Sequence, residues 1–208
     1  MGFSFSVHAE SNADAGATSS IAELALHDPS PASTSIRMKL HGIEDLRSTP
    51  SQPSTLSENG MDELKIMAQA RYLAKKLKTD EASVRQFIVL AWKEANRRSL
   101  DPELLIAIIK KESGFRPTVQ SRYGAQGLMQ VVRRWHREKL HPSESLFDPE
   151  VNIRVGAEVL EEYLAQADGD MHSALKKYSG NARGYVNSVL NESRTLARIA
   201  EQATSVQG

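Results

Sequence analysis

Six consecutive apolar residues, 104–109, constrain the fold of this chain more than any other segment. Asp101, Pro102 and Glu103 come before them and supply, in order, an N-cap residue, a first-turn proline and a first-turn acid. After them, Gly114 suits the left-handed position that ends a helix. A helix that is apolar on all sides must be covered on all sides, so we predict that this helix lies buried at the centre of a domain.

The rest of the chain beyond residue 60 has the spacing and the capping residues of further helices. No segment shows the alternation that is typical of a strand. We therefore predict a single all-α domain of about 140 residues. Its other helices are expected at 61–78, from Asp80 to about 96–99, in a short helix beginning at Leu128, from Asp148 to about Gln166, from Asp170 to Tyr178, and from about 186 to 199.

Residues 1–60 differ in composition from everything that follows. They contain twelve Ser, four Thr and four Pro and few large apolar residues, so burial cannot offset their ordering entropy. We predict that they form a mostly disordered leader. This leader has 3 basic and 7 acidic residues, against 23 and 19 in the remainder, which gives net charges of −4 and +4. Such a small, scattered surplus favours an anionic polymer and does not indicate nucleic acid.

Several kinds of site and segment are missing from the sequence. There is no cysteine, which excludes disulfides, thiol nucleophiles and thiolate metal sites. His136 and His141 are separated by charged residues and have no obvious third partner, so we expect no metal site. No apolar stretch has the length of a membrane span, and the first residues lack the basic region and apolar core of a secretory signal.

Glu112 is the candidate catalytic residue because it stands at the end of the buried helix. Helix-terminal carbonyl groups and apolar surroundings both disfavour the carboxylate, and both raise its pKa. A glutamate that keeps its proton near neutral pH is suited to general acid cleavage of a glycosidic bond. The alternative is a solvated glutamate after two lysines. Other acids stand at helix caps or, like Glu158, Glu161 and Glu162, on a polar helix face where solvation is expected.

A set of short motifs follows Glu112 in a characteristic order. They are Glu112-Ser113-Gly114-Phe115-Arg116-Pro117, Ser121, Gly124-Ala125, Gly127-Leu128-Met129-Gln130, Asp148-Pro149, Asn152-Ile153, Gly156, Ala174-Leu175 and Tyr178. Over about residues 100–190 the chain resembles the catalytic domain of soluble-type (SLT) lytic transglycosylases. The resemblance implies a lysozyme-like fold, with the catalytic domain at 100–204 and N-terminal helices at 61–99 packed on it.

The same resemblance implies a reaction. Soluble-type lytic transglycosylases cleave the β-1,4 bond between N-acetylmuramic acid and N-acetylglucosamine without water and without a cofactor, and leave a 1,6-anhydro end. Glu112 would protonate the glycosidic oxygen and then deprotonate the muramyl C6 hydroxyl as it attacks C1. One acid without a partner suits this chemistry, whereas ordinary glycosidases pair two carboxylates. A hydrolytic muramidase, and a non-catalytic peptidoglycan-binding or secretion-assembly protein, are the alternatives.

Five further residues are implied to bind substrate. Ser121 matches a serine near the acid, although a loop serine also serves as a turn residue. Met129 and Gln130 match the motif that walls the sugar cleft, where Met129 has a core role as its alternative and the Gln130 amide suits sugar hydroxyl or acetamido groups. Tyr178 matches a tyrosine whose phenol reaches toward the catalytic glutamate, with core packing as its alternative. Asn181 stands in the third motif.

The sequence departs from the family pattern in two places. The third motif at 178–185 reads Tyr-Ser-Gly-Asn-Ala-Arg-Gly-Tyr where the family commonly has Tyr-Asn-Ala-Gly. Residues 131–136 replace a usual proline and capping threonine, and here Trp135 either stacks on a sugar ring or packs in the core. The basic residues of this segment either form a solvated face or bind stem-peptide carboxylates: Arg133, Arg134, His136 and Arg137.

Peptidoglycan glycan strands are the expected partner, with secretion-system or cell-wall machinery as a further one. We expect a periplasmic destination, because a sugar cleft built on a glutamate has no obvious polymer to cut in the cytoplasm. Since no secretory signal is recognisable, the expected route is either a signal upstream of this Met1 or a dedicated secretion system.

Overall fold

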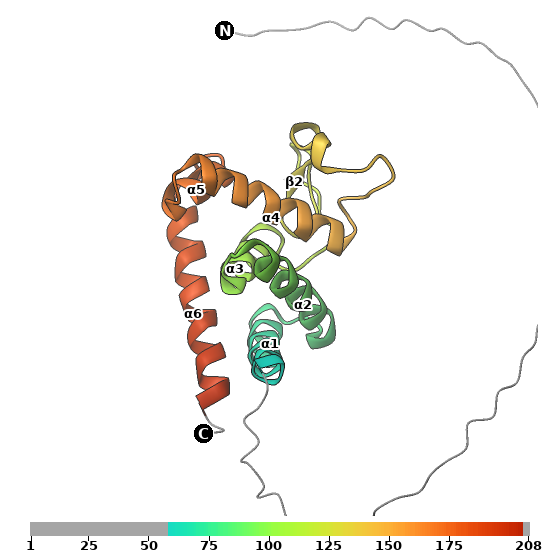
Figure 1. The fold of residues 1–208 in the computed structure, drawn as a ribbon. Coiled ribbons are helices and arrows are strands. Elements are labelled where there is room, and N and C mark those ends of the chain that lie inside the picture. The colour runs from blue at the N-terminus through green and yellow to red at the C-terminus, as the bar shows by residue number, and fades with distance from the viewer. Residues whose placement is uncertain (1–57, 206–208) are drawn as a thin grey trace, which may run out of the picture. The chain divides into compact units, whose positions relative to one another are not determined.

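A computed structural model describes residues 58–205 (Figure 1). The leader predicted to be disordered, residues 1–60, lies outside this range except for residues 58–60, which belong to the first helix. Between residues 58 and 205 the chain forms six α-helices, one two-stranded sheet and two short 3-10 helices. These are α1 (Glu58–Leu77), α2 (Glu81–Arg98), α3 (Pro102–Ser113), β1 (Ala125–Gln126), β2 (Val131–Val132), η1 (Arg133–Trp135), η2 (Arg137–Lys139), α4 (Pro149–Gln166), α5 (Met171–Tyr178) and α6 (Tyr185–Ser205).

α3 lies at the centre of the helices and packs against α2 and α6 (Figure 1). All six residues from 104 to 109 are buried. Asp101 has the extended backbone of an N-cap, although its side chain makes no capping hydrogen bond. Gly114 ends the helix with a φ of 60°, and its N–H donates to the carbonyl of Lys110 at 3.1 Å. The prediction of a buried central helix is confirmed.

Three aspartates start helices as predicted. The side chains of Asp80, Asp148 and Asp170 each accept hydrogen bonds from backbone N–H groups in the first turn of α2, α4 and α5. Capping of this kind satisfies donors that have no partner within the helix. None of the helices between residues 58 and 205 has the combined length and apolar character that crossing a bilayer requires.

α1 packs against both α2 and α6. Its buried Gln69 joins three helices, because Trp92 Nε1 of α2 donates to Gln69 Oε1 at 3.0 Å and Gln69 Nε2 donates to Glu103 Oε1 of α3 at 2.9 Å. Leu73, on the same helix, is fully buried. These contacts make α1 part of the same hydrophobic core as α3.

We expect Leu73→Ala to lower the free energy of unfolding by ~2–5 kcal/mol, because it removes buried methyl groups and leaves a cavity. Chemical denaturation followed by circular dichroism measures the change. Met67→Ala is the matched control, since Met67 lies on α1 with 39% of its surface exposed. If both variants were equally stable, α1 would not be an integral part of the core.

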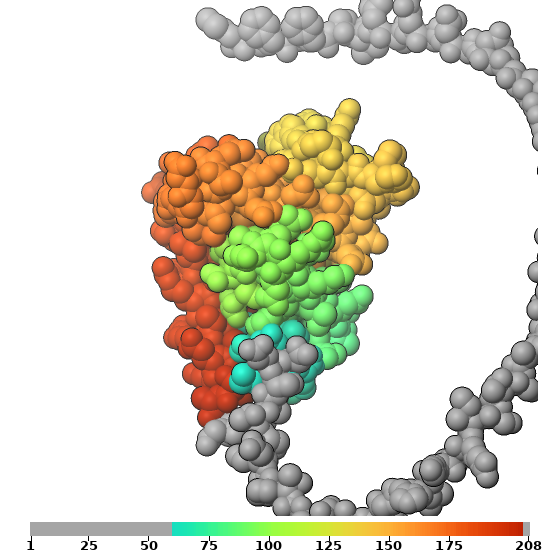
Figure 2. Space-filling view, viewed as in Figure 1, coloured from blue at the N-terminus to red at the C-terminus, as the bar shows by residue number. Residues whose placement is uncertain are grey.

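The short helix predicted from Leu128 is wrong. Residues 125–132 form a small antiparallel hairpin, in which Ala125 pairs with Val132 and Gln126 pairs with Val131. The chain then continues into η1 and η2. In Figure 2 this part of the molecule, in yellow, projects beyond the packed helices.

Asn152 of α4 provides the physical reason for the hairpin. Its buried side chain accepts from the N–H of Met129 at 2.7 Å and donates to the carbonyls of Gln126 and Leu146, both at 2.8 Å. Gly127 has a φ of 74°, and a Cβ there would lie 2.2 Å from the Leu146 oxygen. Hydrogen bonds to a distant helix thus hold this loop in a non-helical path.

Candidate active site

Glu112 is the penultimate residue of α3, and its side chain faces the first residue of α6. The hydroxyl of Tyr185 donates to Glu112 Oε1 at 2.6 Å. Tyr185 is 5% exposed, whereas Glu112 is half-buried, so this hydrogen bond is partly buried. Contact between the two helices therefore fixes the position of the carboxyl group.

The surroundings of Glu112 favour its protonated form. Burial raises the pKa of Glu112, while the hydrogen bond from Tyr185 and the charge of Lys111 act in the opposite direction without reversing the shift. Burial and the nearby Glu112 charge raise the pKa of Tyr185, so its hydroxyl remains a donor. The site thus favours the protonated form of Glu112 through burial, while the Tyr185 hydroxyl and the Lys111 charge stabilise the carboxylate.

The hydroxyl of Tyr178 does not donate to Glu112. It donates to the main-chain oxygen of Met129 at 3.0 Å. Burial raises the pKa of Tyr178 and the negative charge of Glu112 adds to this, so the ring lies close to the acid without bonding to it. The phenol that bonds to Glu112 belongs to Tyr185, which sequence reasoning did not single out. The one sequence feature that could have indicated Tyr185 is its position at the end of the third motif, seven residues after Tyr178.

We expect Tyr185→Phe to shift the alkaline limb of the activity profile to higher pH. A hydrogen bond to the ionised form lowers a carboxyl pKa, so its removal raises the pKa of Glu112 further. Turnover should also fall about tenfold as the carboxyl group loses its orientation. Initial rates across a pH series measure both effects. An unchanged profile would show that this hydrogen bond does not influence the pKa of Glu112.

The structure places Met129 and Ser121 in structural roles. The side chain of Met129 is fully buried and lies against Gly156, where an added Cβ would come 2.6 Å from its sulfur atom. It is therefore packed as a core residue, which is the alternative role considered for it. Ser121 Oγ accepts from the N–H groups of Tyr123 and Ala125 at 3.3 and 3.1 Å, and so closes a turn while its own proton remains to be donated.

Gln130 and Asn181 lie beside different hollows. Gln130 Nε2 donates to the carbonyls of Val119 and Gly127 at 3.1 and 3.0 Å, which leaves Oε1 to accept a hydrogen bond from a substrate. Asn181 is exposed in the turn after α5 and lines a hollow with Lys176, apart from Gln130 and Tyr178. The structure does not bring Asn181 to the hollow that those two residues share.

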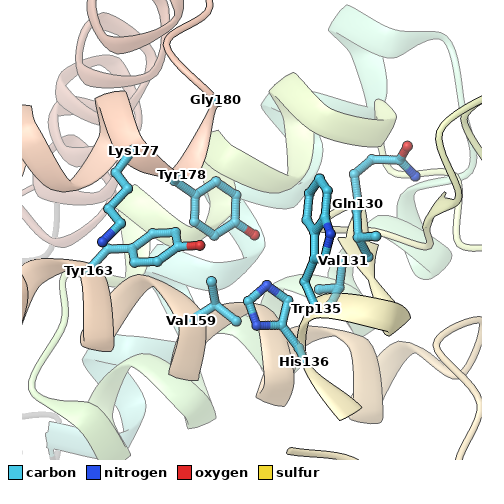
Figure 3. A pocket seen from close by; sticks show the side chains of 10 residues that line it. Gln130, Val131, Trp135, His136, Val159, Tyr163, Lys177, Tyr178 and Gly180 are labelled. Carbon is cyan, nitrogen blue, oxygen red and sulfur yellow. The ribbon is translucent and has the colours of Figure 1, made fainter. Parts of the chain in front are cut away.

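That shared hollow has a volume of about 120 Å³ and lies between α4, α5 and the segment after β2 (Figure 3). Trp135 stands across it from Tyr178 and Tyr163, with His136 at its edge. The core role considered for Trp135 is wrong, because 62% of its surface is exposed. Burial lowers the pKa of His136, which favours the neutral imidazole. We call this hollow the aromatic pocket.

The other acids of the domain do not join Glu112. The pKa of Glu112 responds to burial, Tyr185 and Lys111, and to no second carboxylate in the part of the chain that the structure describes. The three acids of α4 are half-exposed or exposed as expected, but they form ion pairs: Arg98 contacts Glu158 and Glu161, and Lys139 contacts Glu158 and Glu162. Residues 58–205 also contain no group of three side chains arranged to hold a metal ion.

Comparison with known families identifies the class of this domain. The family described as Transglycosylase SLT domain matches residues 90–200, which is more than half of the 208 residues. The chain belongs to this family, and the expectation of an all-α, lysozyme-like fold is confirmed.

The matches with individual relatives cover only part of each relative's length. The chain is similar to a membrane-bound lytic murein transglycosylase C from Pectobacterium atrosepticum, with 33% identity over 54% of this chain and 36% of the relative. For the protein of the same name from Yersinia pestis, identity is 34% over 47% of this chain and 32% of the relative. A solved structure, an inactive mutant of the lytic transglycosylase Slt from Pseudomonas aeruginosa, has 25% identity and a TM-score of 0.44, and covers 69% of this chain and 28% of that one. The chain thus spans about a third of the curated relatives.

Proposed function

We propose that this protein is a peptidoglycan lytic transglycosylase that cleaves the β-1,4 bond between N-acetylmuramic acid and N-acetylglucosamine. The observation that carries this proposal is the environment of Glu112 in an SLT domain. Burial raises the pKa of the carboxyl group, and its hydrogen-bond partner is a tyrosine, not a second acid. Such a site supplies one proton-transfer group and leaves the nucleophile to the substrate.

The proposed reaction uses Glu112 twice. Glu112 first gives its proton to the glycosidic oxygen, and the bond from C1 of the muramyl unit to that oxygen breaks. The resulting carboxylate then takes the proton of the C6 hydroxyl while that oxygen bonds to C1, which closes the 1,6-anhydro ring and restores the acid. Tyr185 and Lys111 favour the intermediate carboxylate, whereas burial favours the acid at either end of the cycle.

Analysis of the products tests the reaction. Purified peptidoglycan is digested with the full chain, and the muropeptides are measured by mass spectrometry. A transglycosylase leaves muramyl ends that are lighter by one water than those left by a hydrolytic muramidase. Reducing ends alone would indicate hydrolysis. Absence of any cleavage, with binding to the polymer retained, would indicate a non-catalytic peptidoglycan-binding or assembly protein.

Ser121 and Gln130 are proposed to bind substrate beside Glu112. Each keeps one polar group that is not used in the loop, the hydroxyl proton of Ser121 and Oε1 of Gln130. Asn181 is a weaker proposal because it lines a separate hollow. No cofactor is needed for the proposed proton transfers.

The proposed substrate also implies a location. Glycan strands lie outside the cytoplasmic membrane, so we propose that the protein acts in the periplasm, either alone or with cell-wall or secretion machinery. Cell fractionation with a C-terminal tag tests this proposal. Recovery of all the protein with cytoplasmic markers, in cells with active secretion systems, would contradict it.

A further inference from the structure

The aromatic pocket contains an exposed indole and is lined by Tyr178, whose pKa the charge of Glu112 helps to raise. Tyr178 thus forms the link between the pocket and Glu112. Trp135 faces Tyr178 across the pocket and is 62% exposed (Figure 3). An indole that is left in solvent beside a pocket lined by aromatic rings is typical of a surface that binds a ligand.

The segment that presents Trp135 is tied firmly to α4. The Lys139 side chain is only 5% exposed and pairs with Glu158 at 3.4 Å and also with Glu162. Arg154 of α4 donates to the main-chain oxygen of Lys139 at 3.1 Å and pairs with Glu144 at 2.7 Å. These contacts hold the segment that carries Trp135 in place. The segment therefore loses less conformational entropy when a ligand binds.

The groups around the indole can orient the ring and exchange hydrogen bonds with sugar hydroxyl groups. The Arg134 guanidinium lies 5.0 Å from the Trp135 ring centroid and restrains the ring's orientation. His136 is favoured in its neutral form, in which one ring nitrogen donates and the other accepts hydrogen bonds from hydroxyl groups. Gln130 also lines the pocket, although its amide points away from it toward the preceding loop (Figure 3).

We propose that Trp135 is a substrate-binding residue whose indole stacks on the pyranose ring of one N-acetylhexosamine unit and sets the register of the glycan strand relative to Glu112. The inference rests on the proposed function and assigns part of its specificity to a segment that departs from the usual family pattern. The pocket, at about 120 Å³, is smaller than the roughly 300–1,000 Å³ of sites that enclose whole ligands. This size suits one unit of a strand that continues over the surface.

A binding experiment tests the stacking directly. The full chain carrying Glu112→Gln is titrated with tetra-N-acetylchitotetraose and followed by acrylamide quenching of fluorescence. The chain has two tryptophans, and Trp92 is only 7% exposed, so quenching reports mainly on Trp135. We expect saturating probe to protect Trp135 from quenching. Absence of saturable binding, or unchanged quenching at saturation, would overturn the inference.

Variants in the same background separate stacking from general effects. Calorimetric titration should show Kd about tenfold higher for Trp135→Ala and within about threefold of the parent for Trp135→Phe. Arg137→Ala, an exposed neighbour on the same segment, should bind the uncharged probe as the parent does. Equal Kd values for Trp135→Ala and its parent would refute the stacking.

An activity measurement distinguishes failure of this inference from failure of the proposed function. In the chain with Glu112 intact, we expect Trp135→Ala to raise KM about tenfold with little change in kcat, because stacking contributes to binding and not to proton transfer. Anhydro products with an unchanged KM would refute the role of Trp135 alone. If the parent formed no anhydro products, the reaction would be wrong, while the binding titration would still report on the pocket.

Discussion

Glu112→Gln is expected to reduce lytic activity by a factor of ~10²–10⁴ while the domain stays folded. The amide is nearly isosteric with the acid and can still accept the hydrogen bond from Tyr185, but it has no proton to give to the glycosidic oxygen. Release of soluble muropeptides from purified peptidoglycan measures the loss. Glu201→Gln, an exposed change on α6, is the control and should retain full activity. Activity of Glu112→Gln within a few-fold of the parent would contradict the assignment of Glu112 as the acid.

The same variant should be more stable than the parent at neutral pH. Burial raises the pKa of Glu112 in the folded chain above its unfolded value of about 4.3, so ionisation of this group costs folding free energy. This cost is absent in acid, where the group is protonated in both states. It grows as the pH rises above the unfolded pKa and is complete above the folded pKa. The difference in unfolding free energy between variant and parent should therefore vanish at low pH and increase toward neutrality.

Asn152→Ala is expected to destabilise the domain by several kcal/mol and to abolish activity. The substitution leaves the Met129 N–H and the carbonyls of Gln126 and Leu146 without their partner, and each buried unsatisfied group costs ~1–3 kcal/mol. These groups shape the hairpin that carries Gln130 and leads to Trp135. Residues 125–139, which we call the cleft wall because they border the proposed sugar cleft, should therefore lose their arrangement as stability falls. Thermal and chemical unfolding measure the first effect.

A matched change separates this effect from the loss of an amide in general. Asn187 is exposed on α6, and Asn187→Ala should change stability by no more than about 0.5 kcal/mol. For Asn152→Ala, activity should be lost even at temperatures well below its unfolding transition. Parent-like stability and activity of Asn152→Ala would show that the hairpin does not depend on this side chain.

The sequence predicts the helices of this domain well because local and tertiary preferences agree there. Around α3, the N-cap position, the first-turn proline, the apolar run and the terminal glycine all indicate the same boundaries. The three capping aspartates act in the same way, since a helix start depends on residues within one turn. Glu112 was identifiable for a related reason, because the feature that marks it is its place at the end of its own helix, which the local sequence shows.

The cleft wall was not predictable in the same way. The apolar residues after Gly127 are too few for periodicity to distinguish helix from strand, and the deciding hydrogen bonds come from Asn152 on α4. Likewise, the Tyr185 to Glu112 hydrogen bond joins residues 73 positions apart. Trp135 looks like a core residue by type, but it is exposed, on a segment that the ion pairs of Lys139 hold against α4. These features depend on contacts between helices, which no local pattern records.

The acid and the cleft wall are anchored to different parts of the scaffold. Glu112 is positioned by α3 and α6, whereas residues 125–139 are positioned by Asn152 and Arg154 of α4. We therefore expect changes in residues 133–147 to affect the choice of substrate more than the proton transfers proposed for Glu112. Exchanging residues 133–147 for the corresponding segment of another SLT domain should alter the lengths of the glycan products while leaving their anhydro ends unchanged. Glu112 would thus stay fixed between α3 and α6, while the exchangeable segment 133–147 would determine the length of the glycan products.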